Sequence, residues 1–394
     1  MIANKIKDRD EGRMQGLVQS GVLFAASHAD SPFVAMDEIM RDLGSEPLAG
    51  AIVFCSHRYD AQKLSHAINT RTEGMQVIGC TSSGELTQNG YDHDSVSMIG
   101  FPASAFRLVS HCFLNLDSFN PAIARAAVRT LAAQAERQSR ELGETVNHVA
   151  LFLVDGLSHS EELLTMTVQD ALGEIPLIGG SSGDDLTFRQ TSIFEGGAFH
   201  QRAAVVAILS TPRPLHVFKA QHYRPGERKM VITAALPMQR IVTEINAEPA
   251  ASEYLRLAGH AGEELGTEFF AAHPPMVRAG GEYHVRSVQT ANPDGSLTFY
   301  CAIDEGLVLT VGEPFDRIAG MEALFSDIRK DIGPVDRIIA FDCVLNRIDA
   351  EHRQIARDVS DLYRRHGVIG FNTYGEQYHA LHVNQTFSGL AIGL

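Results

Sequence analysis

Three glycine-containing stretches of this chain resemble one another: VIGCTSSGEL at 77–86, LIGGSSGDDL at 177–186 and VIGFNTYGEQ at 368–377. Each is preceded by an apolar run and a helix-like stretch, and each is followed by a second apolar run. Buried strands read as continuous apolar runs, so the pattern predicts a unit of strand, helix, short strand, glycine-rich turn and strand. Copies of one supersecondary unit usually stack into one architecture.

The flanking segments set the boundaries of these three units. Ser160, followed by two glutamates, is a typical helix N-cap and opens the helix of the second unit. The predicted first strands are Ala51–Cys55, Val149–Val154 and Ile338–Cys343, the helices are Asp60–Thr70, Ser160–Leu172 and Ala350–Arg365, and the closing strands are Ser95–Phe101, Ala203–Leu209 and Phe387–Leu394.

A different, β-rich region separates the second and third units. Its NPDG sequence at 292–295 is a strong hairpin signal. We therefore predict an α/β protein, of mixed α+β type, with repeated strand-helix-strand units in two halves, 20–214 and 215–394, and a β-rich insert in the second half. Further predicted elements are helices over Pro121–Leu142, Glu248–Gly259 and Pro314–Lys330, and strands over Tyr283–Gln289, Leu297–Ile303 and Leu307–Val311.

Charge and composition narrow the functional classes. A net charge of −15 over 394 residues repels nucleic acids and anionic membrane surfaces, so neither is an expected partner. We find no apolar run of the roughly 18 residues that a membrane-spanning helix needs. The first sixteen residues are polar and do not resemble a secretory signal. Five scattered cysteines without a CxxC pair fit a reducing cytoplasm.

The three turns share a glycine, small or hydroxylic residues and an acid. Glycine allows a ligand close to the backbone, and neighbouring hydroxyls and N–H groups can hold polar groups. The alternative is a tight turn whose acid, at Glu85, Asp185 or Glu376, only organises the chain. No P-loop or GxGxxG fingerprint is present. The predicted ligand-cleft residues are Gly79, Cys80, Thr81, Gly179, Ser181, Ser182, Gly370, Asn372 and Thr373.

These turns, together with several other stretches, resemble the FIST family (F-box and intracellular signal transduction proteins) over nearly the whole chain. The resemblance implies a cytoplasmic sensory protein with a FIST N and a FIST C domain that binds a small ligand. The further matching stretches are FCSHRYD (54–60), FLVDGLSHSEE (152–162), VFKAQHYRP (217–225), IVTEINAEPAASEYLRLAG (241–259), FAAHPPMVR (270–278), DGSLTFYCAIDEGLVLTV (294–311) and HVNQTFSGLAIG (382–393).

Three of these stretches, with QHYRP, AAHP and HVNQTF, are similar to bacterial nitric-oxide-sensing haemoproteins of the FIST class. That similarity implies b-type haem, an iron-based nitric oxide sensor, and a partner histidine kinase in a two-component system. Haem requires an axial ligand such as histidine, and arginines suit its carboxylates. The ranked histidine candidates are His222, His273, His382 and His200, each alternatively a hydrogen-bonded structural histidine, and the arginine candidates are Arg224, Arg278 and Arg286.

A second metal pattern, ExxHxxH, comprises Glu376, His379 and His382. On a helix these residues would share one face. The segment instead reads as turn and strand, which would place Glu376 and His382 on one face and His379 on the other, so we expect no mononuclear site here.

Two other functional classes remain open. One is a sensor of a small, amino-acid-like metabolite without haem. The oligomeric state also stays open, with a homo-oligomer as one alternative. The other is an enzyme with Cys80 as nucleophile, or with Asp155 and His159 or Asp184 and Asp185 as acid–base groups. We find no GxSxG, HExxH or SxxK motif, so the non-catalytic interpretation is preferred.

Overall fold

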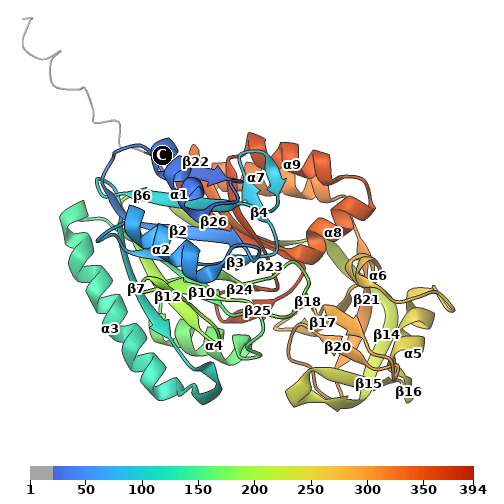
Figure 1. Cartoon of the computed structure of the whole chain (residues 1–394). Coiled ribbons are helices and arrows are strands. Elements are labelled where there is room, and N and C mark those ends of the chain that lie inside the picture. Colours follow the sequence, from blue (N-terminus) through green and yellow to red (C-terminus); the bar gives the residue numbers. More distant parts are fainter. Residues whose placement is uncertain (1–20) are drawn as a thin grey trace, which may run out of the picture.

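The computed structural model describes residues 21–394 and confirms a mixed α/β protein (Figure 1). Three six-stranded sheets form the body of the molecule, and an eight-stranded sheet forms the insert. The polar segment that we judged unlike a secretory signal lies outside the described residues. Within residues 21–394, no helix is both long enough and apolar enough to cross a membrane.

Each predicted unit forms a pair of parallel strands joined by helix, and we call the three units repeats one, two and three. In each, a later strand pairs antiparallel with the first strand. The apolar runs thus form strands as predicted. The elements are β2 (Leu48–Ser56), α2 (Ala61–Arg71), β3 (Val77–Ser82) and β6 (Val96–Pro102); β8 (Asn147–Val154), α4 (Glu161–Leu172), β9 (Leu177–Ser181) and β12 (Ala204–Thr211); and β22 (Val335–Cys343), α8 (Val344–His352), α9 (Ala356–Arg365), β23 (Val368–Thr373) and β26 (Thr386–Gly393).

The hairpin that follows each glycine turn joins the sheet of another repeat. The hairpin of repeat one pairs with β23, that of repeat two with β3, and that of repeat three with β9. This cyclic exchange forces the three turns together. The hairpins are β4 (Glu85–Thr87) with β5 (Gly90–Asp92), β10 (Ile193–Glu195) with β11 (Ala198–His200), and β24 (Glu376–Tyr378) with β25 (Leu381–Val383).

The outer strands follow the same cyclic rule. The strand after β6 joins the sheet of repeat two, and the strand after β12 joins the sheet of repeat three. The N-terminal strand completes the sheet of repeat one. These outer strands are β7 (Arg107–Phe113), β13 (Leu215–Gln221) and β1 (Leu23–Ser27).

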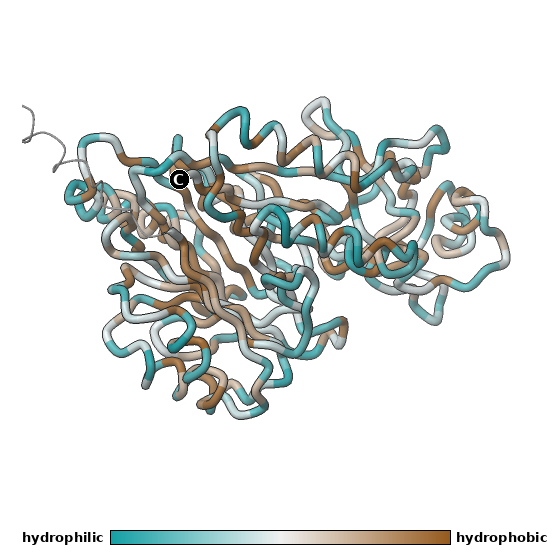
Figure 2. The backbone as a smooth tube through the Cα atoms, turned by 90° about the horizontal axis from the view of Figure 1, so that it is seen from above, coloured by the Kyte–Doolittle hydropathy of each residue, from teal (hydrophilic) through white to brown (hydrophobic). Residues whose placement is uncertain are grey.

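The inner faces of the three sheets share one apolar core, and helices cover the outer faces. Phe54 of repeat one meets Phe371 of repeat three in this core, with 4.4 Å between ring centroids. Hydrophobic strands run through the middle of the molecule in Figure 2. The additional helical elements of this body are α1 (Pro32–Leu43), α3 (Pro121–Ser139), α7 (Arg317–Ile332) and the short turns η1 (Leu116–Ser118) and η2 (Arg140–Leu142).

Helix starts follow local capping chemistry in part. Asp60 caps α2 by accepting the Lys63 N–H, as its position predicts. Ser160 precedes α4 as predicted, but its hydroxyl donates to the Ser158 carbonyl and makes no cap. The single helix predicted over Ala350–Arg365 is wrong: α8 ends at His352 and α9 begins at Ala356.

The insert has its own apolar core beneath its sheet. The NPDG turn closes a hairpin as predicted, but the strand predicted over Tyr283–Gln289 is two strands separated by Arg286 and Ser287. The insert elements are β14 (Tyr223–Leu236), η3 (Pro237–Gln239), β15 (Ile241–Ile245), β16 (Glu248–Pro249), α5 (Ala250–Ala258), α6 (Thr267–Ala272), β17 (Pro275–Ala279), β18 (Glu282–Val285), β19 (Val288–Ala291), β20 (Leu297–Phe299) and β21 (Val308–Pro314).

Candidate functional site

The three glycine turns contact one another directly. Ser83 N–H donates to the Asn372 carbonyl and Asn372 N–H donates to the Gly84 carbonyl, joining turns one and three. Ser181 and Tyr374 bridge turns two and three, while Gly183 N–H donates to the Thr81 carbonyl of turn one. The turns therefore form one backbone-bonded centre.

The shared glycines are required by backbone packing. A Cβ on Gly79 would overlap the Val53 carbonyl oxygen, one on Gly179 the Phe152 oxygen, and one on Gly370 the Ala340 oxygen. In each case the obstructing carbonyl belongs to the paired parallel strand. The repeated glycine is thus explained by the close approach of two strands.

Two turn acids hold their own hairpins closed. Glu85 accepts bonds from the Ser95 hydroxyl (2.8 Å) and N–H (3.3 Å), and from the Ser82 hydroxyl. Glu376 repeats this with Thr386, at 2.7 and 3.0 Å, and with Thr373. Burial raises the pKa of Glu85 to about 7 and that of Glu376 to about 8.

In repeat two the organising acid is Asp184, and the expectation for Asp185 is wrong. Asp184 accepts bonds from three backbone N–H groups, of residues 188–190, at 2.7–3.0 Å. Asp185 is half exposed and pairs with Arg347 at 3.1 Å. Two hydroxyls, those of Thr187 and Tyr374, also donate to the Asp184 carboxylate.

Most side chains of the predicted ligand cleft are already engaged. Cys80 lies in the apolar core, and burial raises the pKa of its thiol well above the usual value, which opposes a nucleophilic role. Thr81 and Ser182 each accept a backbone N–H, and Ser181 accepts the Gln377 amide. The amide of Asn372 donates to the Asp342 carbonyl.

Beside turn three, the insert meets repeats two and three. Asn384 forms an isolated β-bridge with Val285 of the insert. Ser287 donates to the side chain of Gln385, and Gln385 donates to the Ala271 carbonyl. The end of the insert's β18 is thereby fixed against the segment that follows β25.

A charged anchor holds the insert against α4. Arg240, at the turn before β15, donates to Glu161 and Glu162 at 2.7 Å each, and also to the Tyr300 carbonyl. Glu162 accepts the Ala302 N–H at 2.6 Å with its other oxygen. Burial raises the pKa of Glu161 despite the adjacent Arg240 charge. The charge of Arg240 is therefore paired with two carboxylates.

Several buried polar atoms in this region lack any hydrogen-bond partner. A Cβ on Gly375 would lie 2.9 Å from His382 Nε2 and 3.0 Å from Asn384 Nδ2, so both side chains border turn three. We call this group the junction site. Its unpaired atoms are Arg286 Nε and Nη1, Tyr300 Oη, Gln377 Oε1, His382 Nε2, and Asn384 Oδ1 and Nδ2.

The electrostatic state of His382 suits ligand recognition. Burial lowers its pKa to about 4, with Glu162 opposing that shift, so the imidazole is neutral near pH 7. Its Nδ1 lies 3.2 Å from the Gln377 amide, which also contacts Ser181. The Nε2 atom is left facing the site with no partner.

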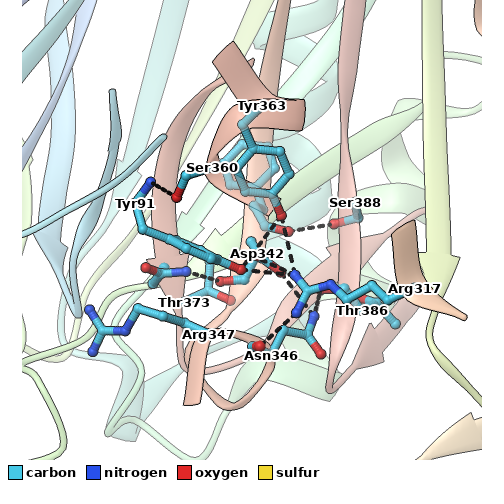
Figure 3. A network of polar contacts seen from close by, with 12 residues as sticks. Tyr91, Arg317, Asp342, Asn346, Arg347, Ser360, Tyr363, Thr373, Thr386 and Ser388 are labelled. Carbon is cyan, nitrogen blue, oxygen red and sulfur yellow. Dashed lines mark hydrogen bonds and ion pairs between the residues drawn. The ribbon is translucent and has the colours of Figure 1, made fainter. Parts of the chain in front are cut away.

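A second buried network, drawn in Figure 3, is neutralised internally. Asp342 accepts the hydroxyls of Tyr91 and Tyr363 at 2.8 Å and the Asn346 amide at 2.9 Å. Arg317 lies 3.4 Å from the same carboxylate. Because cation and anion are paired here, this network supports the packing of α7, α9 and β22.

The structure separates the histidines proposed as haem ligands. His222 is buried against Phe315, His273 is half-buried beside His260, and His200 contacts the Glu195 carbonyl. Of the proposed residues, only His382 and Arg286 contribute to the junction site. Arg224 is exposed and pairs with Glu313, and Arg278 is exposed on β17.

The ExxHxxH pattern is dispersed by a hairpin. The chain reverses at His379, so Gln377 is opposite His382 and Glu376 is opposite Val383. The prediction that Glu376 and His382 share a face is therefore wrong. Across residues 21–394, no group of three or more His, Cys, Asp or Glu side chains could hold a metal ion.

Sequence reasoning missed much of this junction. Asn384 and Gln377 stand in the quoted HVNQTF and GEQY stretches, and Tyr300 in LTFYC, but single polar residues in apolar strands were not weighed as binding groups. The sequence feature that could have indicated them is an amide or phenol side chain inside a β-rich, largely apolar stretch. Glu161 and Glu162 were interpreted only as helix-start acids.

Comparison with known families fits this architecture. A FIST N domain model matches residues 49–248, and a FIST C domain model matches residues 250–379. The chain belongs to the FIST family, whose domains are associated with ligand binding in sensory signal transduction. No curated protein matches the chain.

Proposed function

We propose that this protein is a cytoplasmic sensor whose small polar ligand binds at the junction site. The observation that carries this proposal is the set of unpaired buried atoms of Gln377, His382 and Asn384. Arg286 acts electrostatically on His382, and the ring of Tyr300 lies 5.8 Å from that of Tyr374 in turn three. A buried polar group without a partner costs about 1–3 kcal/mol. A ligand that supplies the missing bonds would remove this cost.

The location also provides a route from ligand to signal. The junction site contains residues of the insert and of repeat three, and Arg240 links the insert to repeat two. A ligand that bridges these parts favours one arrangement of the insert over another, which is the requirement for a switch. As the resemblance implies, the proposed partner that responds to this change is a histidine kinase. Its response would be measured as a change in its autophosphorylation rate.

The proposed function is tested by thermal unfolding with a small-molecule extract of bacterial cells. The extract should raise the melting temperature of the wild type and should not raise that of Asn384→Leu. Asn89→Leu, in the exposed β4–β5 turn, is the matched control and should respond like the wild type. An equal response of all three proteins would place the ligand elsewhere.

Haem b is the second candidate ligand, favoured by two buried histidines with an unpaired Nε2, His222 and His382. Burial, with Arg317 nearby, holds the pKa of His222 well below its usual value, and neutral imidazole is the form that binds iron. The polar neighbours of His382 fit a small polar molecule better than a porphyrin face. His222, packed against Phe315, is therefore the better axial ligand, and haem bound there would supply the affinity for nitric oxide.

The visible spectrum of the haemin-treated protein tests this candidate. A Soret band that shifts with nitric oxide in the wild type and in His57→Ala, but is altered in His222→Ala, would support haem at His222. His57 is exposed and serves as the control. A protein that stays colourless after haemin treatment would eliminate haem and leave the small polar ligand.

A further inference from the structure

One end of repeat three carries a basic pocket, although the protein as a whole has a net charge of −15. The pocket has a volume of about 300 Å³ and lies between the C-terminal half of α7, the start of β22 and the turn that joins α9 to β23. Four arginines in one pocket create a locally positive potential in an acidic protein. The basic residues that line it are Arg329, Arg337, Arg364, Arg365 and His366.

The acids near the pocket neutralise only part of this charge. Asp336 also lines the pocket, but its carboxylate accepts the Val22 N–H at 2.7 Å and pairs with Arg213 at 3.0 Å. Two further acids are each paired with one exposed arginine at 2.8 Å, Glu322 with Arg365 and Asp361 with Arg364. These three acids therefore leave no negative charge for the other two arginines.

Arg329 and Arg337 have no carboxylate partner within residues 21–394, and both are held at the pocket. Arg329 donates to Nδ1 of His366 at 2.9 Å, and this imidazole stacks on Phe325 with 4.4 Å between ring centroids. Burial and the Arg329 charge lower the pKa of His366, so the imidazole adds no charge near pH 7. A Cβ on Gly367 would lie 3.3 Å from Nη1 of Arg337, whose buried Nε has no partner. The pocket thus keeps two uncompensated positive charges.

The fold itself does not require these cations. Arginines in the last turn of a helix can complement the helix dipole, but Arg337 stands on a strand. In repeat one, the corresponding turn from helix to strand borders a pocket with Glu73 and Glu195 and no Arg, Lys or His among its described lining residues. In repeat two, the last turn of α4 contains no basic residue. The basic pocket is therefore particular to repeat three.

We infer that this pocket binds the phosphate group of a small phosphate monoester. Such a group carries a charge of about −1.5 to −2 at pH 7, which matches the two uncompensated arginines. Guanidinium N–H groups also match the geometry of phosphate oxygens and bind them in pairs. Phe325, Ile328 and Val335 line the same pocket and offer an apolar contact for the organic part of the molecule. This inference does not depend on the ligand proposed for the junction site.

The test is calorimetric titration of the full chain with methyl phosphate, dimethyl phosphate, inorganic phosphate and acetate at about pH 7.5. Methyl phosphate is mainly a dianion at this pH, so it should bind at least about tenfold more tightly than dimethyl phosphate or acetate. Arg329→Met and Arg337→Met should each weaken its binding by at least about tenfold. Arg129→Met, which removes an exposed arginine of α3 outside the pocket, should bind like the wild type.

Circular dichroism checks the folding of both pocket variants. Arg329 is exposed, so Arg329→Met tests the pocket even if Arg337→Met does not fold. The inference is overturned if methyl phosphate does not bind, if acetate binds equally well, or if Arg329→Met binds like Arg129→Met. Tighter binding of inorganic phosphate than of methyl phosphate would assign the pocket to the free ion and overturn the monoester.

Discussion

The three glycine turns that are bonded to one another, here called the turn centre, and the junction site both bury many polar groups, but only the turn centre pairs them. Glu85 and Glu376 receive three hydrogen bonds each, from equivalent residues of repeats one and three. A few residues away, Asn384 has neither of its side-chain polar atoms paired. The difference indicates that the repeated motif has a structural role, whereas the binding site that we propose lies where the insert breaks the threefold pattern.

The largest expected effect comes from the glycines of the turn centre. Gly179→Ala places a Cβ against the Phe152 carbonyl oxygen of the paired strand, and neither strand can withdraw without breaking the core. We expect a loss of at least about 4 kcal/mol in the free energy of unfolding, measured by urea denaturation. Gly266→Ala, with open space around it, should lose less than about 1 kcal/mol. Equal losses would mean that the strands tolerate separation.

Removing Arg240, the charged anchor between the insert and α4, should lower the free energy of unfolding by nearly as much. Arg240→Met leaves Glu161 and Glu162 without their cation, and breaking a buried pair costs about 3–5 kcal/mol. Arg125→Met removes only a pair with the exposed Asp170 and should cost under about 1 kcal/mol. Urea midpoints of the two variants measure the difference. A small effect at Arg240 would show that the insert is held by packing alone.

The equivalent acids of the turn centre should respond equally. Glu376→Ala and Glu85→Ala each leave two hydroxyls and one N–H without their acceptor. Each should lower the free energy of unfolding by about 2–3 kcal/mol. Glu376→Gln resembles the protonated acid and should cost no more than about 1 kcal/mol, with ligand binding retained. Chemical denaturation measures both. A binding loss in Glu376→Gln with an intact fold would move the site to the turns.

The pH dependence of stability is a smaller and more specific signature of these acids. Burial raises the pKa of Glu376 from the reference 4.5 to about 8 and that of Glu85 to about 7. Between the unfolded pKa of 4.5 and the raised native pKa, the native state binds more protons than the unfolded state. The stability that this protonation contributes is therefore full below about pH 4.5 and is lost as pH rises to 8. In urea denaturation from pH 5 to pH 8, the wild type should therefore lose more stability than Glu376→Gln. Parallel curves would show that Glu376 titrates normally.

The sequence predicted the repeats well because each strand of the core is a continuous apolar run. The strands β2, β8 and β22 and the capped helix α2 follow from local patterns. The exchange of hairpins could not be predicted, since β4, β10 and β24 pair with residues a hundred or more positions away. That exchange is what brings the turns together.

The site was predictable only in part for the same reason. His382 was named from a family-like stretch and Arg286 only as an arginine suited to carboxylates, yet their common location depends on the insert folding back onto β25. His379 reverses the chain with a positive φ of 51°, and this reversal places His382 opposite Gln377. In repeat two, Asp184 replaces the glycine of the other turns and takes the organising bonds, which a motif alignment assigns to Asp185.

The central claim is that the junction site is built for a ligand at the expense of stability. The most direct measurement is the free energy of unfolding of ligand-free Asn384→Leu, with its ligand response measured on the same sample. Replacing a buried, unpaired amide by an apolar side chain of similar size should raise this free energy by about 1 kcal/mol and abolish the ligand response. A loss of stability as large as that of Glu376→Ala, or an unchanged ligand response, would contradict the claim.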